Sequence, residues 1–237
     1  MRICLFFLCC LLYQQAAAQP RIAIIIDDIG YQQATSKAAI ELDPNITVAV
    51  IPQSPYGKQL AEYAHLLQRE TLIHLPMAAN GTDNLDPGGI TPEHSAQQIR
   101  ATVLDAFKRI PNAVGLNNHM GSRTTEDSHA MTAVMNTLAE QEAFFVDSRT
   151  SGASVGETVA RETGVPSTRR HVFLDNQQDY RSINRQFNQL LQHARQHGSA
   201  VAIGHPYPET IAYLKHVLPL LKETEIEVVP VSRLIAF

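Results

Sequence analysis

The chain has 237 residues, with 19 Lys and Arg against 23 Asp and Glu, and its formal net charge is −4. No basic cluster stands out, which argues against nucleic acid as a partner because phosphate backbones are bound by grouped Lys and Arg. All three cysteines, Cys4, Cys9 and Cys10, precede residue 19, so the remaining chain offers no thiol for a disulfide, a thiolate metal site or a catalytic nucleophile.

The N-terminus has the pattern of a cleaved secretory signal. A positive charge at Arg2 is followed by the apolar run Ile3–Tyr13 and by small residues ending at Ala18. The run is too short to span a bilayer, which takes about 20 residues. We therefore predict a signal peptide over residues 1–18, a domain over 19–237 without a transmembrane span, and a periplasmic or secreted location. An uncleaved anchor and a lipid anchor at Cys9 or Cys10 are less favoured alternatives.

Short apolar runs alternate with helical patterns along the rest of the chain. Eight runs without polar alternation are typical of strands buried on both faces of a parallel sheet: Arg21–Ile26, Ile46–Ile51, Thr71–Leu75, Ala113–Leu116, Phe144–Val146, Val172–Leu174, Ala200–Ile203 and Glu227–Val231. Helices are predicted between them: Ala34–Glu41, Gly57–Arg69, Thr91–Arg109, Ser128–Gln141, Ser154–Thr163, Ile183–His197 and Pro208–Glu223. The third of these is expected to begin with a Thr91 cap and Pro92 in the first turn.

This alternation predicts an α/β fold, in the form of a distorted (β/α) barrel of seven or eight mainly parallel strands. An open doubly wound sheet is the second choice. It gains nothing from nucleotide-binding motifs, because neither GxGxxG nor GxxxxGK[ST] occurs in the chain.

Acids and histidines follow six of the predicted strands. The segments are Asp27-Asp28, His74, Asn117-Asn118-His119, Asp147-Ser148-Arg149, Asp175 and His205. In a parallel barrel the carboxyl ends of all strands open on one face, where loops build the active site. A shared metal or dense hydrogen bonding would explain so many polar groups beside apolar sequence.

The pair Asp27-Asp28 requires a particular backbone to act at one site. Neighbours in a regular strand point to opposite faces. Both can face one site only if the strand ends near Ile26 and the chain turns at Gly30. One Asp would then bind metal while the other forms a hydrogen bond or accepts a proton. A helix cap followed by a solvated acid is the structural alternative.

His74 and His119 are the best nitrogen ligands. With Asp28 they form an Asp-His-His set that leaves one coordination position open, as a catalytic zinc site requires. The alternative for His74 is a core histidine bonded to a backbone carbonyl, and the alternative for His119 is a turn residue.

His205, in Ile203-Gly204-His205-Pro206, suits an acid that protonates a leaving group because its ordinary pKa lies near neutrality. Asp147 with Arg149, and Asp175 with Arg169 or Arg170, are predicted as ion pairs that orient ligands, or as purely structural pairs. Arg123 is a candidate for binding an anionic group of a substrate.

These motifs together resemble the divergent polysaccharide deacetylase family. The resemblance rests on Ile24–Gly30, His74–Met77, Asn117–Ser122, Val146–Ser148, Phe173–Asp175 and Gly204–Pro206, and it covers roughly residues 20–236. It implies the distorted barrel of the polysaccharide deacetylases. It further implies that Asp27 is the general base, Asp28 a metal ligand and His205 the acid.

The chain departs from the main polysaccharide deacetylase pattern in one place. The two metal-binding histidines of those enzymes lie three residues apart, and no such pair exists here, so His74 and His119 are proposed in their place. The expected activity is metal-dependent hydrolysis of an amide, with zinc as the expected metal and an N-acetyl group of a cell-envelope carbohydrate as substrate. A non-catalytic protein that binds a glycan or partner is the alternative of another class, and hydrolysis of a phosphate or another bond is a third.

Overall fold

The computed structural model describes residues 19–235, and the predicted signal sequence lies outside this range. One parallel sheet runs through the described part, with strand order β6-β5-β4-β3-β2-β1-β8-β7 and with β9 paired to β1. Its strands are β1 (Arg21–Ile29), β2 (Thr47–Val50), β3 (Thr71–Met77), β4 (Gly115–Met120), β5 (Phe144–Asp147), β6 (Ser167–Arg169), β7 (Val172–Phe173), β8 (Ser199–Gly204) and β9 (Glu227–Val228).

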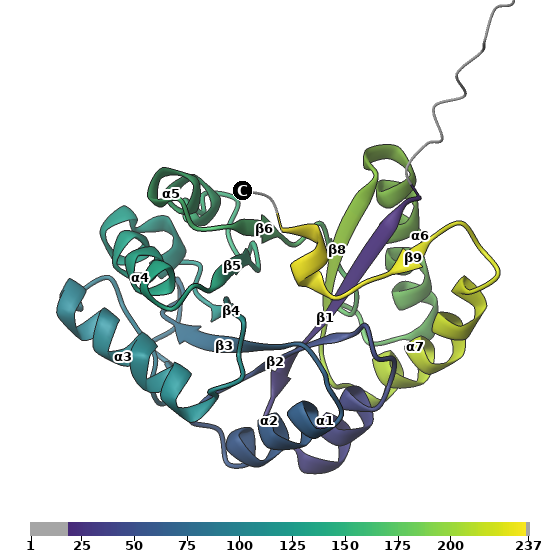
Figure 1. Ribbon diagram of the computed structural model, residues 1–237, viewed down its shortest axis with the longest axis horizontal. Coiled ribbons are helices and arrows are strands. Elements are labelled where there is room, and N and C mark those ends of the chain that lie inside the picture. The colour runs from purple at the N-terminus through teal and green to yellow at the C-terminus, as the bar shows by residue number, and fades with distance from the viewer. Residues whose placement is uncertain (1–18, 236–237) are drawn as a thin grey trace, which may run out of the picture.

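The helices surround the convex side of the curled sheet (Figure 1). They are α1 (Gln33–Ile40), α2 (Gly57–Leu66), α3 (Ala96–Arg109), α4 (Ser128–Glu140), α5 (Gly156–Thr163), α6 (Tyr180–His197) and α7 (Pro208–Leu221), with short 3₁₀ turns η1 (Thr124–Glu126) and η2 (Val231–Leu234). The larger apolar core lies between helices and sheet, where outward-facing residues such as Ile22, Ile24 and Ile26 of β1 are fully buried.

A second, smaller core fills the inside of the curl. Its strand residues include Ala23 and Ile25 of β1 and Val201 and Ile203 of β8, and η2 contributes Val231. The Val231 amide donates to Thr47 Oγ1 at 3.0 Å, and the Ser232 amide donates to Glu70 Oε1 at 3.2 Å. Because Thr47 and Glu70 lie at or before the first residues of their strands, the C-terminal segment closes the amino end of the barrel. The carboxyl end remains for a functional site.

The sheet stays open between β6 and β7, which are its two edge strands although they are consecutive in the chain. The distorted (β/α) barrel of mainly parallel strands is therefore confirmed, in an incompletely closed form. Strand β6 was not predicted, because Ser167–Arg169 is a short polar edge strand without the apolar run that marks the others.

The predicted start of the third helix is wrong. Helix α3 begins at Ala96, not at Thr91, and Ser95 is its N-cap. The Ser95 hydroxyl accepts from the Gln98 amide, and the Gln98 side chain accepts from the Ser95 amide, which forms a capping box. This reciprocal pair satisfies two backbone amides at the start of the helix.

Within residues 19–235, no helix is both long enough and apolar enough to cross a membrane.

Candidate metal centre

The period of two along a strand explains which polar side chains enter the barrel. Inner-core residues Ile25, Leu72 and Ile203 are each followed, two positions later, by Asp27, His74 and His205. Alternate residues of a strand share a face, so these three side chains continue the inner face beyond the apolar core. The inside of the barrel therefore changes from apolar to polar at one level near the carboxyl ends of the strands.

A backbone irregularity brings Asp28 to the same side as Asp27. The pairing of β1 with β2 shifts between Ile26 and Ile29, and Asp28 has a left-handed φ of 57°. A bulge of this kind redirects a side chain that would otherwise face outward. Strand β1 continues to Ile29, so the predicted strand end near Ile26 is wrong. The bulge, and not the end of the strand, turns Asp28 to the same side as Asp27.

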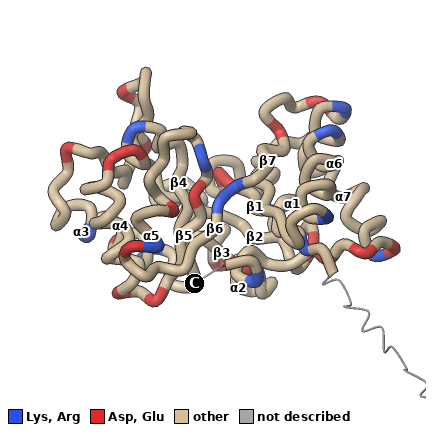
Figure 2. The backbone as a smooth tube through the Cα atoms, turned by 90° about the horizontal axis from the view of Figure 1, so that it is seen from above, with Lys and Arg blue, Asp and Glu red and all other residues tan. Residues whose placement is uncertain are grey.

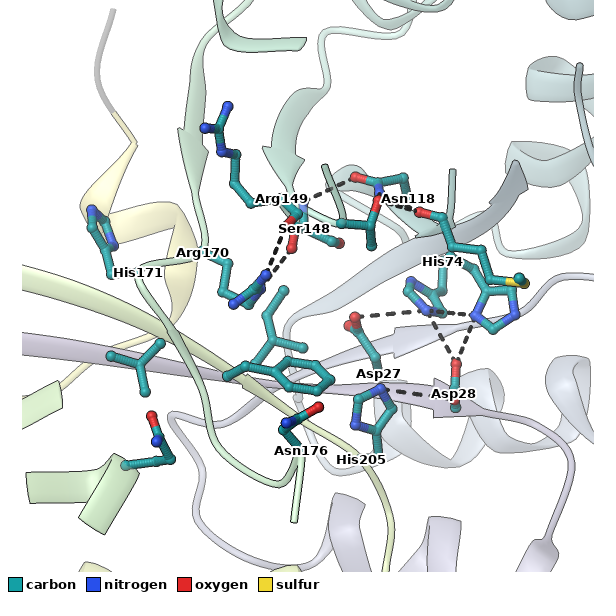
Figure 3. Close-up of a pocket in the computed structure, with 17 residues that line it drawn as sticks. Asp27, Asp28, His74, Asn118, Ser148, Arg149, Arg170, His171, Asn176 and His205 are labelled. Atoms are coloured by element: carbon teal, nitrogen blue, oxygen red, sulfur yellow. Dashed lines mark hydrogen bonds and ion pairs between the residues drawn. The ribbon is translucent and has the colours of Figure 1, made fainter. Parts of the chain in front are cut away.

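Strand register brings the two histidines together. His74 of β3 pairs with Asn117 of β4, and His119 lies two residues beyond Asn117 on the same face. Asp28, His74 and His119, here called the metal triad, consequently converge (Figure 3). The distance from Asp28 Oδ1 is 2.9 Å to His119 Nδ1 and 3.2 Å to His74 Nε2, and the two nitrogens lie 3.1 Å apart.

The triad has the geometry of three ligands of one cation. Tetrahedral zinc with ligands at about 2.0–2.1 Å holds its donor atoms about 3.3 Å apart, close to the three distances observed. Asp28 Oδ1 is buried without a hydrogen bond, although two imidazole nitrogens lie beside it. Oxygen and nitrogen donors of this kind suit zinc, and a three-residue set leaves a position for substrate.

Two outer contacts orient the histidines. His74 Nδ1 lies 2.8 Å from Asn117 Oδ1, an acceptor, so Nδ1 carries the proton and Nε2 presents its lone pair to the triad. His119 Nε2 lies 3.3 Å from Asp86 Oδ2, which leaves Nδ1 for the triad. Sequence reasoning noted Asn117 as a polar residue after a strand but gave it no role, and it missed Asp86. The inward register of β4 could have indicated Asn117, but nothing in the sequence marked Asp86, which lies in the connection between β3 and α3.

Asp27 lies beside the triad as a buried carboxylate. Its Oδ1 accepts from Asn117 Nδ2 at 2.8 Å, and its Oδ2 lies 3.6 Å from His74 Nε2. Burial raises the pKa of Asp27 above its ordinary value, and the nearby His74 and His205 only partly offset this. Burial also opposes ionisation of Asp28, but the adjacent His119 and His74 outweigh it and lower the pKa of Asp28. The two neighbouring acids are thus tuned in opposite directions.

His205 approaches the triad from β8, across from the two other histidines. Its Nδ1 lies 2.9 Å from Asp175 Oδ1, and its Nε2 lies 3.9 Å from Asp28 Oδ2. Asp175 also accepts from the His205 amide at 2.6 Å and from Thr210 Oγ1 at 2.8 Å. Burial lowers the pKa of His205, but Asp175, followed by Asp28 and Asp27, outweighs this effect and the net pKa is raised.

The remaining predicted residues are placed differently. Asp175 bonds His205 and not Arg169 or Arg170, so the predicted ion pair is absent among the described residues. Asp147 is fully buried and accepts from the Arg149 backbone amide and from Ser154 Oγ, rather than from the Arg149 guanidinium. Asp147 and Asp175 are buried, and their carboxylates accept hydrogen bonds from other groups of the protein. They are therefore placed to orient those groups, and this geometry gives no support to the predicted contact with substrate.

Arg149 lines the pocket beside the triad, but its guanidinium contacts the carbonyls of Ser154 and Gly152 at 3.4 and 3.3 Å. Arg123 is exposed, pairs with Glu93 and is not among the residues that line this pocket. Their predicted role in binding substrate remains a prediction.

Three of the five non-glycine residues with left-handed backbone in the described part of the chain line this pocket. Asp28, Met120 and Arg149 have left-handed φ values of 57°, 55° and 51°, and all three line the pocket. Left-handed backbone at residues other than glycine is uncommon and gathers at functional sites. The fold and the site together define a class of protein: a (β/α) barrel with an Asp-His-His centre at the carboxyl ends of its strands.

Comparison with known proteins identifies the family. A model of the divergent polysaccharide deacetylase family matches residues 24–235, so the chain belongs to this family. It is 42% identical over 206 residues to an uncharacterized protein of Haemophilus influenzae, covering 87% of this chain and 74% of the other. It is 39% identical over 198 residues to the uncharacterized protein YibQ of Escherichia coli, covering 84% of this chain and 62% of the relative, less than two thirds of its length.

Solved structures support the fold assignment. An uncharacterized protein from Agrobacterium tumefaciens superposes with a TM-score of 0.84 at 24% identity, covering 92% of this chain and 90% of the other. A CE4 family pseudoenzyme from Bacillus anthracis superposes with a TM-score of 0.57 at 13% identity, covering 91% and 65%. The fold is therefore that of the CE4 proteins.

Proposed function

We propose that this protein is a metal-dependent hydrolase of amide bonds that removes N-acetyl groups from a carbohydrate of the cell envelope. The observation that carries the proposal is the convergence of Asp28, His74 and His119, with donor atoms 2.9–3.2 Å apart, beside a buried acid and a carboxylate-bound histidine. A divalent cation, zinc by its donor set, supplies Lewis-acid polarisation of the amide carbonyl and makes water a stronger acid.

Asp27 is placed to remove the proton from the attacking water. Its raised pKa makes it a stronger base than a solvated Asp, and the Asn117 amide fixes one carboxylate oxygen while the other faces the triad. General base catalysis of this kind contributes about 10²–10⁴ in rate.

His205 is placed to protonate the departing amine as the C–N bond breaks. Asp175 binds Nδ1 and thereby orients Nε2 toward the triad, and it favours the protonated ring that a general acid requires. The products are acetate and the amine of the sugar. A signal sequence in residues 1–18 would deliver this activity to the periplasm, where cell-wall glycans lie.

A non-catalytic protein that binds a glycan or a partner is the second candidate. It is supported by the structural likeness to a CE4 family pseudoenzyme, a mutant of which is described as having restored enzymatic activity. The same fold thus occurs without activity, so activity must be measured directly.

The test combines metal analysis with an assay of acetate release from oligomers of N-acetylglucosamine. We expect about one zinc per purified chain. Asp27→Asn should keep the metal and lose about 10²–10⁴ in turnover. Asp28→Asn should lose the metal, and Asn tolerates the left-handed backbone at this position, so folding is not the cause. Asp105→Asn, a surface change on α3, is the control.

Equal metal content in Asp28→Asn and the wild type would refute the assignment of the triad. Metal binding without acetate release, combined with binding of the oligomers, would favour the second candidate.

A further inference from the structure

The pocket beside the metal triad is larger than an acetamido group requires. It has a volume of about 690 Å³, and His119 and Phe173 are among the residues that line it. It extends from Asp28 to Arg170 on the other side of the barrel opening (Figure 3). Pockets of about 300–1,000 Å³ bind ligands of drug size. The far side of the pocket therefore has room for parts of a substrate other than the group that reacts.

Arg170 is fixed on this far side. It follows β6, and its Nε donates to the Ser148 carbonyl at 2.6 Å while Nη2 donates to the Arg149 carbonyl at 2.7 Å. Its guanidinium lies over the Phe173 ring, 5.0 Å from the ring centre. These contacts use two of the five N–H donors and hold the planar group in one orientation. Within residues 19–235, Nη1 has no hydrogen-bond partner.

The charge of Arg170 is not neutralised by a bonded acid. The ion pairs of residues 19–235 do not include Arg170, although it is partly buried. Its neighbour Arg169, by contrast, is exposed and pairs with Glu157 at 3.2 Å. Asp27 and Asp147 act electrostatically on the charge of Arg170, but neither bonds its guanidinium. Because a partly buried charge is stabilised by a bonded opposite charge, an anionic ligand on the guanidinium would stabilise this arrangement.

A second polar group with unused bonding capacity lies next to Arg170. The Ser148 side chain lines the same pocket, its hydroxyl is buried, and it has no hydrogen-bond partner within the described residues. Buried hydroxyls nearly always have a partner. Seen from above, segments with basic and acidic residues lie close together near β6 and β7 (Figure 2). The residues that line the pocket include the acids Asp27 and Asp28 and the bases Arg149 and Arg170.

We propose that the pocket selects an acetamido sugar that also carries an anionic oxygen group, a carboxylate or a phosphate, and that Arg170 binds this group. The acetamido part of the proposal rests on the proposed function, whereas the anion site rests on Arg170 and Ser148. The unused N–H groups of the Arg170 guanidinium donate to the anion, and the Ser148 hydroxyl is a further polar group in the same pocket.

Binding of three sugars to the purified protein, measured by calorimetry, tests this. N-Acetylmuramic acid adds a carboxylate and N-acetylglucosamine 6-phosphate adds a phosphate to the neutral N-acetylglucosamine. We expect at least one anionic sugar to bind about tenfold more tightly than the neutral one, the effect of one charged hydrogen bond. Preference for only one of the two identifies the group.

Arg170→Gln should remove this preference and leave the affinity for the neutral sugar within about twofold, the scatter expected where no charged hydrogen bond is lost. Arg170→Lys should retain part of it, because the charge remains without the planar fork. Arg169→Gln, the neighbouring exposed arginine, should retain it in full.

Equal affinity of the wild type for all three sugars would overturn the proposal, and this result needs no variant to fold. A preference that survives in Arg170→Gln would overturn it too. So would an equal loss for all three sugars in Arg170→Gln, which would mean that Arg170 acts by shaping the pocket around Asp27. An intact preference without acetate release would support the anion site and count against the proposed function alone.

Discussion

At the scale of single residues, Asn117 connects the two halves of the proposed chemistry. Its side-chain oxygen faces His74 Nδ1 and its side-chain nitrogen donates to Asp27, each at 2.8 Å. One amide therefore fixes the tautomer of a candidate metal ligand and the orientation of the candidate base. Asn117 is fully buried, so loss of either contact would leave a buried polar group without a hydrogen-bond partner.

Replacing Asn117 by Leu, which has a similar size, should weaken zinc binding about 10–100-fold, the usual cost of losing a partner that orients a ligand. The dissociation constant is measured by competition with a coloured chelator. Asn176→Leu is the matched control, because Asn176 lines the same pocket without contacting the triad. Unchanged affinity in Asn117→Leu, with folding verified by circular dichroism, would show that His74 does not depend on this bond.

At the scale of the elements, the sequence predicted seven helices and most of the strands, because apolar runs and helical spacing are local signals. Alternation along each strand likewise predicts which side chains point into the site. Inner-core residues at Ile25, Leu72 and Ile203 place Asp27, His74 and His205 inward by the period of two. The same period places Asp147 outward, one position after the inner residue Val146, which is why it bonds Ser154 instead of facing the pocket.

Other features could not be predicted, because they depend on contacts between distant segments. The bulge at Asp28 is a property of how β1 pairs with β2, and no residue of the chain signals its position. Arg170 was considered only as a partner of Asp175. Its actual contacts, the carbonyls of Ser148 and Arg149, belong to the end of another strand. Backbone acceptors of this kind leave no trace in side-chain patterns.

The connection between β6 and β7 contains a titratable residue with a role in stability. His171 Nδ1 accepts from the Val201 amide at 3.0 Å, and its ring lies 4.6 Å from the ring of His193 on α6. Burial, and then the neighbouring His193, lower the pKa of His171 to about 4. A protonated Nδ1 would lose its acceptor function, so the folded protein favours the neutral ring.

The sign of the pH effect follows from this lowered pKa. Between about pH 4 and pH 6.5 the unfolded chain binds more protons at His171 than the folded chain, so stability is lost as the pH falls through this window. His171→Gln, whose amide oxygen can still accept a hydrogen bond, should lose less stability than the wild type between pH 7 and pH 4.5, as measured by urea unfolding. His65→Gln on the outer face of α2 is the control. Identical losses in wild type and His171→Gln would contradict this role.

At the scale of the whole molecule, the two ends of the barrel have separate tasks. The C-terminal segment fills the amino end through Val231 and its bond to Thr47, whereas the triad occupies the carboxyl end. The triad draws its residues from β1, β3 and β4, which span four neighbouring strands of the sheet because β2 lies between β1 and β3. A cation held there would connect β1, β3 and β4 at their carboxyl ends.

Zinc should therefore stabilise the entire fold and not only the site. A ligand that binds only the folded state stabilises it by about 4 kcal/mol at a free concentration 1,000 times its dissociation constant. For a domain of this size, that corresponds to a rise of roughly 10 °C in the melting temperature. We expect this rise in calorimetry when the chelated protein is reloaded with zinc, and no rise in Asp28→Asn, where one ligand is lost while the left-handed backbone is tolerated. Identical melting curves with zinc and with chelator would mean that the three side chains converge without holding a cation.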